Sequence, residues 1–120
     1  MIGTKEKEWQ TELLSVKQFL TDNKFTRTTP DVLDMVAQLV VTDIHDPTFN
    51  IGKAYITLDT RTTNCDSIRM RIANHVKRNF LNVRNSILAK YDYDIGDECF
   101  GVRNFIDQIA IVFSIYGQAY

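Results

Sequence analysis

The sequence predicts a mainly α-helical single domain over residues 1–120. We expect a four-helix, bundle-like arrangement around a long central helix at about residues 67–90, with one short β element at about residues 53–60. Apolar side chains recur every three or four positions over residues 66–91, which is the period of one helix face. Only two prolines and five glycines interrupt the 120 residues, a length that supports one hydrophobic core.

The first helix is expected from about Lys5 to Asp22, with Thr4 as its N-terminal cap. Acidic residues in its first turn suit the positive end of the helix dipole. Its apolar residues fall in steps of four, three and four: Trp9, Leu13, Val16 and Leu20. This spacing places them on one face, which we expect to pack against the core.

The second helix has the clearest start signal in the chain. Thr29 is a favourable N-cap, and Pro30 stands at the first helical position, where its missing N–H costs nothing. Asp46 precedes Pro47, a position that disfavours helical geometry and ends the helix. The residues between these signals are apolar on most sides, so we expect this helix either to lie deep in the core or to pack on another subunit.

The β element is expected at Lys53–Thr60, where apolar and polar residues alternate and β-branched and aromatic residues are common. Its pairing is open: it forms a hairpin with residues 48–51, pairs with a second copy of the chain, or lies over the helices as an extended loop.

The central helix has two apolar rows. The first is Ile68, Ile72, Val76, Phe80, Val83, Ile87 and Tyr91, and the second is Met70, Ala73, Leu81 and Leu88. Together they form an arc wide enough to contact several neighbours. The last helix is expected from about Glu98 to Tyr116, with Gly117 as its C-terminal cap.

Composition excludes several classes of protein. Hydrophobic content of 44% and charged content of 24% are ordinary for a globular domain, and a net charge of −1 argues against a surface that is basic overall. No apolar run approaches the roughly 18 residues that span a bilayer, so we expect a cytosolic protein without membrane contact. Cys65 and Cys99 lack metal-binding spacing and are interpreted as reduced thiols. No catalytic or cofactor motif is present, so we predict a non-enzymatic protein without cofactor or metal.

Candidate binding residues gather on the central helix and on the segment after it. They are Arg71, His75, Lys77, Arg78, Asn82, Arg84, Asp92 and Asp94. Arginine, histidine and amide groups on one helix face could bind phosphates or an acidic protein surface, although a solvated face with local ion pairs is the more common arrangement. Arg69, Lys77 and Arg84 point into the apolar arc, where they pass their neighbours to reach solvent, pair with acids such as Asp34 or Asp107, or face a partner.

The two carboxylates after the central helix, Asp92 and Asp94, lie near Gly96 and Glu98 in a pattern that superficially resembles a calcium loop. The glycine and glutamate are at the wrong positions for one, so we expect no metal there.

Because the second helix is apolar on most sides, the chain has more apolar surface than a four-helix monomer hides, unless this helix is buried centrally. We therefore predict a small protein-binding domain with an inhibitor, immunity-type or accessory-subunit role. Its partner would be another protein, and we expect it to form a homo-oligomer such as a dimer. The alternative is a nucleic-acid-binding accessory subunit that uses the basic helix face.

One resemblance favours that alternative. The C-terminal helix with Phe105-Ile106, Phe113 and Tyr116-Gly117, together with the helix start TTPDVLDMV, resembles the small helical subunits of type III CRISPR effector complexes. The resemblance covers about the last 15 residues and that helix start. It implies RNA binding and assigns no individual residue, and the expected β element departs from the all-helical pattern.

Overall fold

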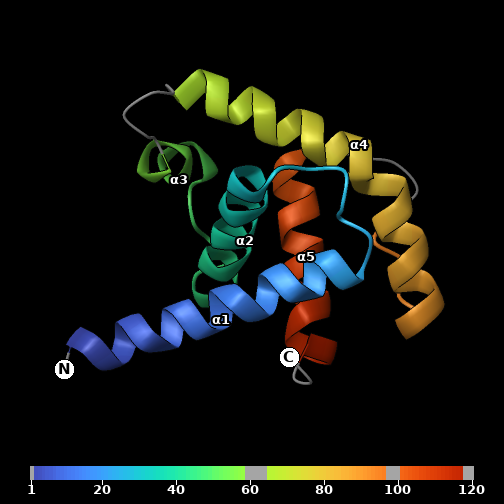
Figure 1. The fold of residues 1–120 in the computed structure, drawn as a ribbon, viewed down its shortest axis with the longest axis horizontal. Helices are drawn as coiled ribbons and strands as arrows, with labels where there is room; N and C mark the ends of the chain where they lie inside the picture. The colour runs from blue at the N-terminus through green and yellow to red at the C-terminus, as the bar shows by residue number, and fades with distance from the viewer. Residues whose placement is uncertain (1, 59–64, 97–100, 118–120) are drawn as a thin grey trace.

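The computed structural model describes residues 2–58, 65–96 and 101–117, which form five helices (Figure 1). They are α1 (Ile2–Asp22), α2 (Pro30–His45), α3 (Ile51–Thr57), α4 (Cys65–Tyr91) and α5 (Val102–Tyr116). The mainly helical class is confirmed. No helix in the described ranges has both the length and the apolarity to cross a membrane.

Helix α2, and not α4, lies at the centre of the fold. It packs between α1 and α5 and also contacts α4 (Figure 1). Eight of its 16 residues are buried, which places its many apolar side chains inside this chain and not on another subunit. The sequence placed α4 at the centre, and this was wrong because its second apolar row faces outward: Met70 is 65% exposed and Leu81 60%.

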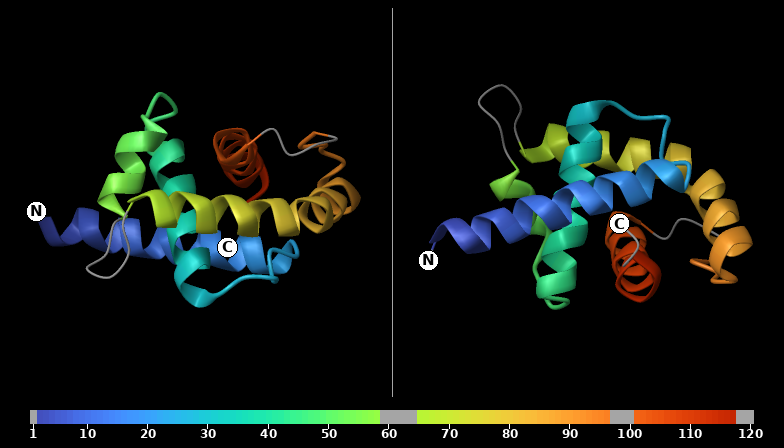
Figure 2. Two further views of the ribbon diagram at one scale, coloured as in Figure 1. Left: turned by 90° about the horizontal axis from the view of Figure 1, so that it is seen from above. Right: turned by 60° about the horizontal axis from the view of Figure 1, so that its bottom comes forward.

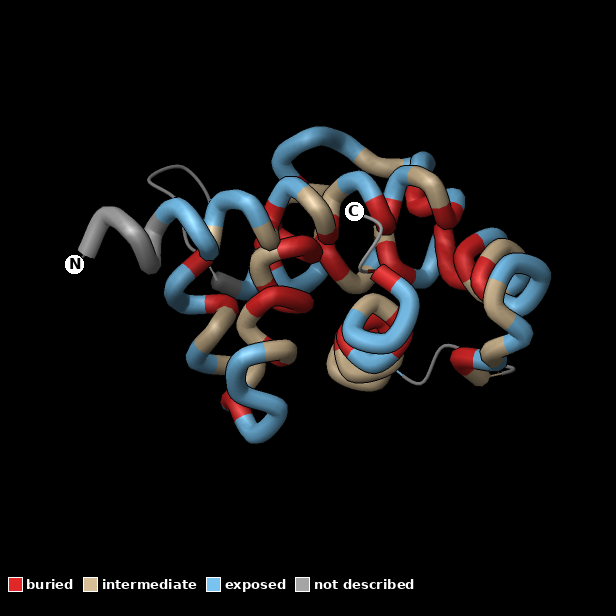
Figure 3. Tube along the Cα trace, turned by 90° about the horizontal axis from the view of Figure 1, so that it is seen from below, coloured by how far each residue is buried: buried red, intermediate tan, exposed pale blue. Residues whose placement is uncertain are grey.

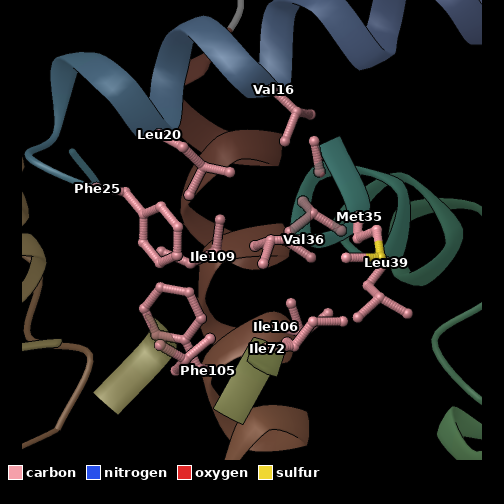
Figure 4. Packing of buried hydrophobic residues seen from close by; sticks show 14 of the residues in the cluster. Val16, Leu20, Phe25, Met35, Val36, Leu39, Ile72, Phe105, Ile106 and Ile109 are labelled. Carbon is pink, nitrogen blue, oxygen red and sulfur yellow. The ribbon is translucent and has the colours of Figure 1, made fainter. Parts of the chain in front are cut away.

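The core forms where α1, α2, α4 and α5 meet (Figure 4). Phe25, which follows α1, packs between Leu20 of α1 and Phe105 of α5, with its ring centroid 5.9 Å from that of Phe105. Buried positions lie mostly on the sides of the helices that face one another, and the outer sides are exposed (Figure 3). This is the pattern that the three-to-four residue spacing predicts.

The predicted β element is wrong: residues 51–57 form α3, and residues 59–60 lie outside the described part of the chain. The Asn50 side chain accepts a hydrogen bond from the Lys53 N–H at 3.0 Å and so caps the helix. Tyr55 and Leu58 are buried, whereas Ile56, which the strand pattern placed on the same side as Leu58, is 62% exposed. A helix buries these residues without needing a partner strand, and the described ranges contain no strand to pair with.

The helix ends also differ in part from expectation. Helix α1 begins at Ile2, so Thr4 lies inside the helix and does not cap it. Helix α5 begins at Val102 after Gly101, whose φ of 112° favours glycine, and residues 98–100 of the expected last helix lie outside the described part. The Gly117 cap is confirmed, since its N–H donates to the Phe113 carbonyl.

The second half of α4 turns beside the end of α1 (Figure 2). The Tyr91 ring stacks on Phe19, with centroids 6.1 Å apart, and on Tyr116 of α5, with centroids 4.7 Å apart. The end of α4 is thereby attached to both α1 and α5.

Candidate functional site

The polar face of α4 holds the connector between α1 and α2. The two segments run in opposite directions, and their contacts keep that order: Asp22 with Lys90, Asn23 with Ser86, Arg27 with Asn79, Thr28 with His75, and Asp31 with Arg71. Two of the candidate binding residues on this face, Arg71 and His75, are therefore engaged within the chain.

Asn79 is the buried member of this set and was not among the predicted site residues. Its side-chain oxygen accepts the Arg27 N–H at 2.8 Å, and its amide nitrogen donates to the carbonyls of Arg27 at 3.0 Å and His75 at 2.8 Å. Asn79 is fully buried, and its amide satisfies both the N–H and the carbonyl of Arg27, as a neighbouring backbone would. The available signal was its position between Val76 and Val83, inside the apolar row of α4.

Four of the eight predicted binding residues have partners in the fold. Arg71 pairs with Asp31 at 2.6 Å, and Arg84 binds both oxygens of Asp94 at 3.0 and 3.2 Å. Hydrogen bonds from Thr29 and Arg71 lower the pKa of Asp31 to about 2, and the bond from Arg84 lowers the pKa of Asp94.

His75, the fourth of these, contacts Thr28 through Nδ1 at 2.8 Å. Burial, followed by the charges of Arg78 and Arg71, lowers the pKa of His75, so the ring is neutral near pH 7. A neutral ring supplies no charge for phosphate binding.

The other four predicted residues, Lys77, Arg78, Asn82 and Asp92, are exposed. Three alternatives were open for the cations in the apolar arc, and the one that named Asp34 or Asp107 as their partners is wrong. Asp34 pairs with Lys17, and Asp107 pairs with Arg103 of its own helix. Arg69 lies over the Tyr55 ring, 5.8 Å from its centroid.

A groove of about 570 Å³ lies between α2 and α5. This is within the range of roughly 300–1,000 Å³ that is usual for binding sites. Its lining combines a polar floor with apolar residues: Asp43, Ile44, Pro47, Asn104, Asp107, Gln108, Ala110, Ile111, Ser114 and Ile115. Ile111 is 44% exposed and Ile115 56%, so apolar surface on α5 borders the groove.

The polar floor of the groove contains a buried carboxyl group, Asp43. Asp43 is only 5% exposed, and its Oδ2 meets no hydrogen-bond donor among the described residues. Burial, and then hydrogen bonding and repulsion from Asp107, raise the pKa of Asp43 to about 7. A second negative charge beside Asp107 is unfavourable, so Asp43 keeps its proton at a pH at which an ordinary aspartate has lost it.

Arg103 supports this pair from one side. Its Nε donates to Asp107 Oδ1 at 2.9 Å, and its terminal nitrogens donate to the carbonyls of Pro47 and Phe49. Its guanidinium also lies 4.0 Å from the centroid of the Phe49 ring. The positive charge of Arg103 balances one carboxylate. When both carboxyl groups are ionised, Asp43, Asp107 and Arg103 together carry a net charge of −1.

Sequence reasoning noted Asp107 as an acid among apolar residues but missed Asp43. The available signal was spacing, because Val36, Val40 and Asp43 follow one another in steps of four and three on the inner face of α2. An acid at a core position of an apolar helix needs a partner or a proton.

The fold and the groove define a small, mainly helical protein with an acidic site bordered by apolar residues. The described part of the chain contains no group of three or more His, Cys, Asp or Glu residues placed to hold a metal ion. No protein-family model, curated protein or solved structure matches the chain.

Proposed function

We propose that this chain is a non-enzymatic, cytosolic protein-binding domain that holds an apolar segment of another protein in the groove between α2 and α5. The observation that carries the proposal is the combination of exposed Ile111 and Ile115 with the buried Asp43 carboxyl group. Contiguous apolar surface next to a few convergent polar groups is typical of binding sites. An inhibitor or accessory-subunit role would use such a surface.

The test compares two charge substitutions at exposed apolar positions. Ile111→Glu places a charge in the groove, and Leu14→Glu is the matched control on α1, where the side chain is 65% exposed. Each variant is immobilised and incubated with an extract of cells that express the chain. We expect a protein retained by the wild type and by Leu14→Glu but lost with Ile111→Glu. Equal retention by both variants would contradict the proposal.

We also propose that the chain self-associates through the outer face of α4. Met70, Leu81 and Leu88 are 65%, 60% and 36% exposed, and their spacing of eleven and seven residues places them on one line along the helix. Light scattering coupled to gel filtration would show a dimer for the wild type and a monomer for Leu81→Glu. A wild type that stays monomeric at high concentration removes this part of the proposal.

Nucleic-acid binding is the second candidate function. A hollow of about 600 Å³ beside the second half of α4 is lined by Lys24 and Lys90 together with Asn82, Asn85 and Ser86, a set of donors suited to phosphate. Single-stranded RNA binding, followed by fluorescence anisotropy, would weaken steeply with salt and would be lost in Lys24→Glu. Binding that is absent at low salt would exclude this candidate.

A further inference from the structure

One oxygen of the Asp43 carboxyl group, Oδ2, is a buried acceptor that meets no donor among the described residues. Removing a carboxyl oxygen from water without a hydrogen bond is unfavourable by several kcal/mol, so such groups take up a proton or a cation. Asp107 lines the same groove, and its side chain is 38% exposed, whereas Asp43 is only 5% exposed. A ligand in the groove can therefore reach Asp107 more readily than Asp43.

The surroundings of the pair favour a single positive charge. Arg103 compensates one of the two carboxylates, and each of its three nitrogens already donates one hydrogen bond, to Asp107 or to a backbone carbonyl. The ionised pair therefore lacks one positive charge. The walls beside it, Ile44 and Ile111, are apolar and would contact a hydrocarbon stem.

These properties match the side chain of lysine. Its ammonium group is a compact charge with three donors, and its four-carbon stem packs along apolar surface. We propose that the Asp43–Asp107 pair binds the ammonium group of a lysine that a protein partner inserts into the groove between α2 and α5. This inference rests on the proposed function and adds the chemistry of the partner.

Binding of the lysine releases the Asp43 proton to solvent. The ammonium keeps its own three protons and takes the place of the proton between the carboxyl groups, so charge balances on both sides. The charged and titratable groups around Asp43 are Asp107 and Arg103 of α5 and Asp46, which follows α2. With the pKa of Asp43 at about 7, proton competition weakens ammonium binding up to about 30-fold from pH 8 to pH 5.5.

The test titrates the full chain with n-butylammonium chloride, which reproduces the lysine stem, and with n-butanol as the uncharged control. Backbone amide NMR spectra are recorded at about pH 8 and about pH 5.5. We expect butylammonium to shift the signals of Asp43, Asp107 and Ile111, with a dissociation constant at least tenfold larger at the lower pH. Asp107→Asn weakens the pH dependence, because it removes the charge of Asp107 but leaves the burial of Asp43, whereas Asp94→Asn, the matched control on the Arg84 pair, retains it in full.

Three results would overturn the inference: equal shifts by butylammonium and butanol, an affinity that does not change with pH, or shifts that lie outside the groove. The wild-type comparison needs no variant, so misfolding of Asp107→Asn would not obscure the outcome. If the butylammonium titration failed but a protein were still captured through the groove, the proposed function would stand and the lysine inference would be lost. Ammonium binding without any captured protein would remove the protein partner.

Discussion

The substitution Asp43→Asn tests most directly how the raised pKa of Asp43 changes the stability of the fold with pH. The folded chain holds a proton that the unfolded chain releases above the ordinary pKa of 3.8, because the pKa of Asp43 is raised to about 7. The stability of the wild type that comes from this protonated pair is complete below pH 3.8 and is lost as the pH rises through 7. Asparagine carries no such proton, so the variant lacks this decline.

The size of this change in the free energy of unfolding follows from the difference between the folded and unfolded pKa values of Asp43. From about pH 5 to pH 8 the free energy of unfolding would fall by up to about 2.7 kcal/mol, at 1.36 kcal/mol per pH unit below the folded pKa. The Asp107 side chain is 38% exposed, so solvent screens the pair. We therefore expect the wild type to lose about 1–2 kcal/mol relative to Asp43→Asn over this range.

Urea unfolding of both proteins at the two pH values, followed by far-ultraviolet circular dichroism, measures this difference. Because Asp31, Asp94 and His75 are present in both proteins, their own titrations cancel. Asp34→Asn on the same helix is the matched control, since Asp34 pairs with Lys17 away from the groove. If the free energies of unfolding of the wild type and Asp43→Asn differed by the same amount at both pH values, the raised pKa of Asp43 would be refuted.

Three further substitutions test the packing and the polar contacts. Gly117→Ala would place a methyl group 2.3 Å from Cδ2 of Phe113; we expect a loss of about 1–3 kcal/mol in thermal unfolding, which Phe113→Leu should relieve. Asn79→Ala leaves the backbone of Arg27 without its buried partner; we expect a loss of about 2–3 kcal/mol and faster hydrogen exchange at the Arg27 amide, and unchanged exchange would contradict the contact. Arg103→Met removes the cation beside the acidic pair, so the pH at which stability declines should rise in urea titrations; an unchanged midpoint would exclude this electrostatic role.

Signals in neighbouring residues predicted both ends of α2. Thr29 and Pro30 mark the start of α2 and Asp46 its end, because the steric limits of proline act on neighbouring residues alone. Residues 51–57 were ambiguous, because two spacings were present at once. Ala54, Ile56 and Leu58 fit an alternating pattern, whereas Ile51, Ala54, Tyr55 and Leu58 fit a helical one. The Asn50 cap and the burial of Tyr55 decided between the two.

The charge partners could not be predicted from the sequence because they depend on how distant helices pack. Arg71 and Asp31 are 40 positions apart, and nothing near either residue identifies the other. The same holds for Asp43 and Asp107, which approach only because α2 and α5 lie side by side. Sequence periodicity could place an acid on an inner face, but it could not show which residue would meet it there.

The attachment of the connector to α4 has a consequence for the order of events during synthesis. Its bonds join residues that are 40 to 68 positions apart, so none of them can form before residue 71 has been translated, and the last needs residue 90. The helices α1 and α2 can begin to pair earlier through their apolar faces, and residues 23–25 can already bond to the end of α1, but residues 26–28 keep an unfixed path until α4 emerges. Native structure in this connector is therefore a late event, and protection of the Arg27 amide would report that the nascent chain has assembled its second half.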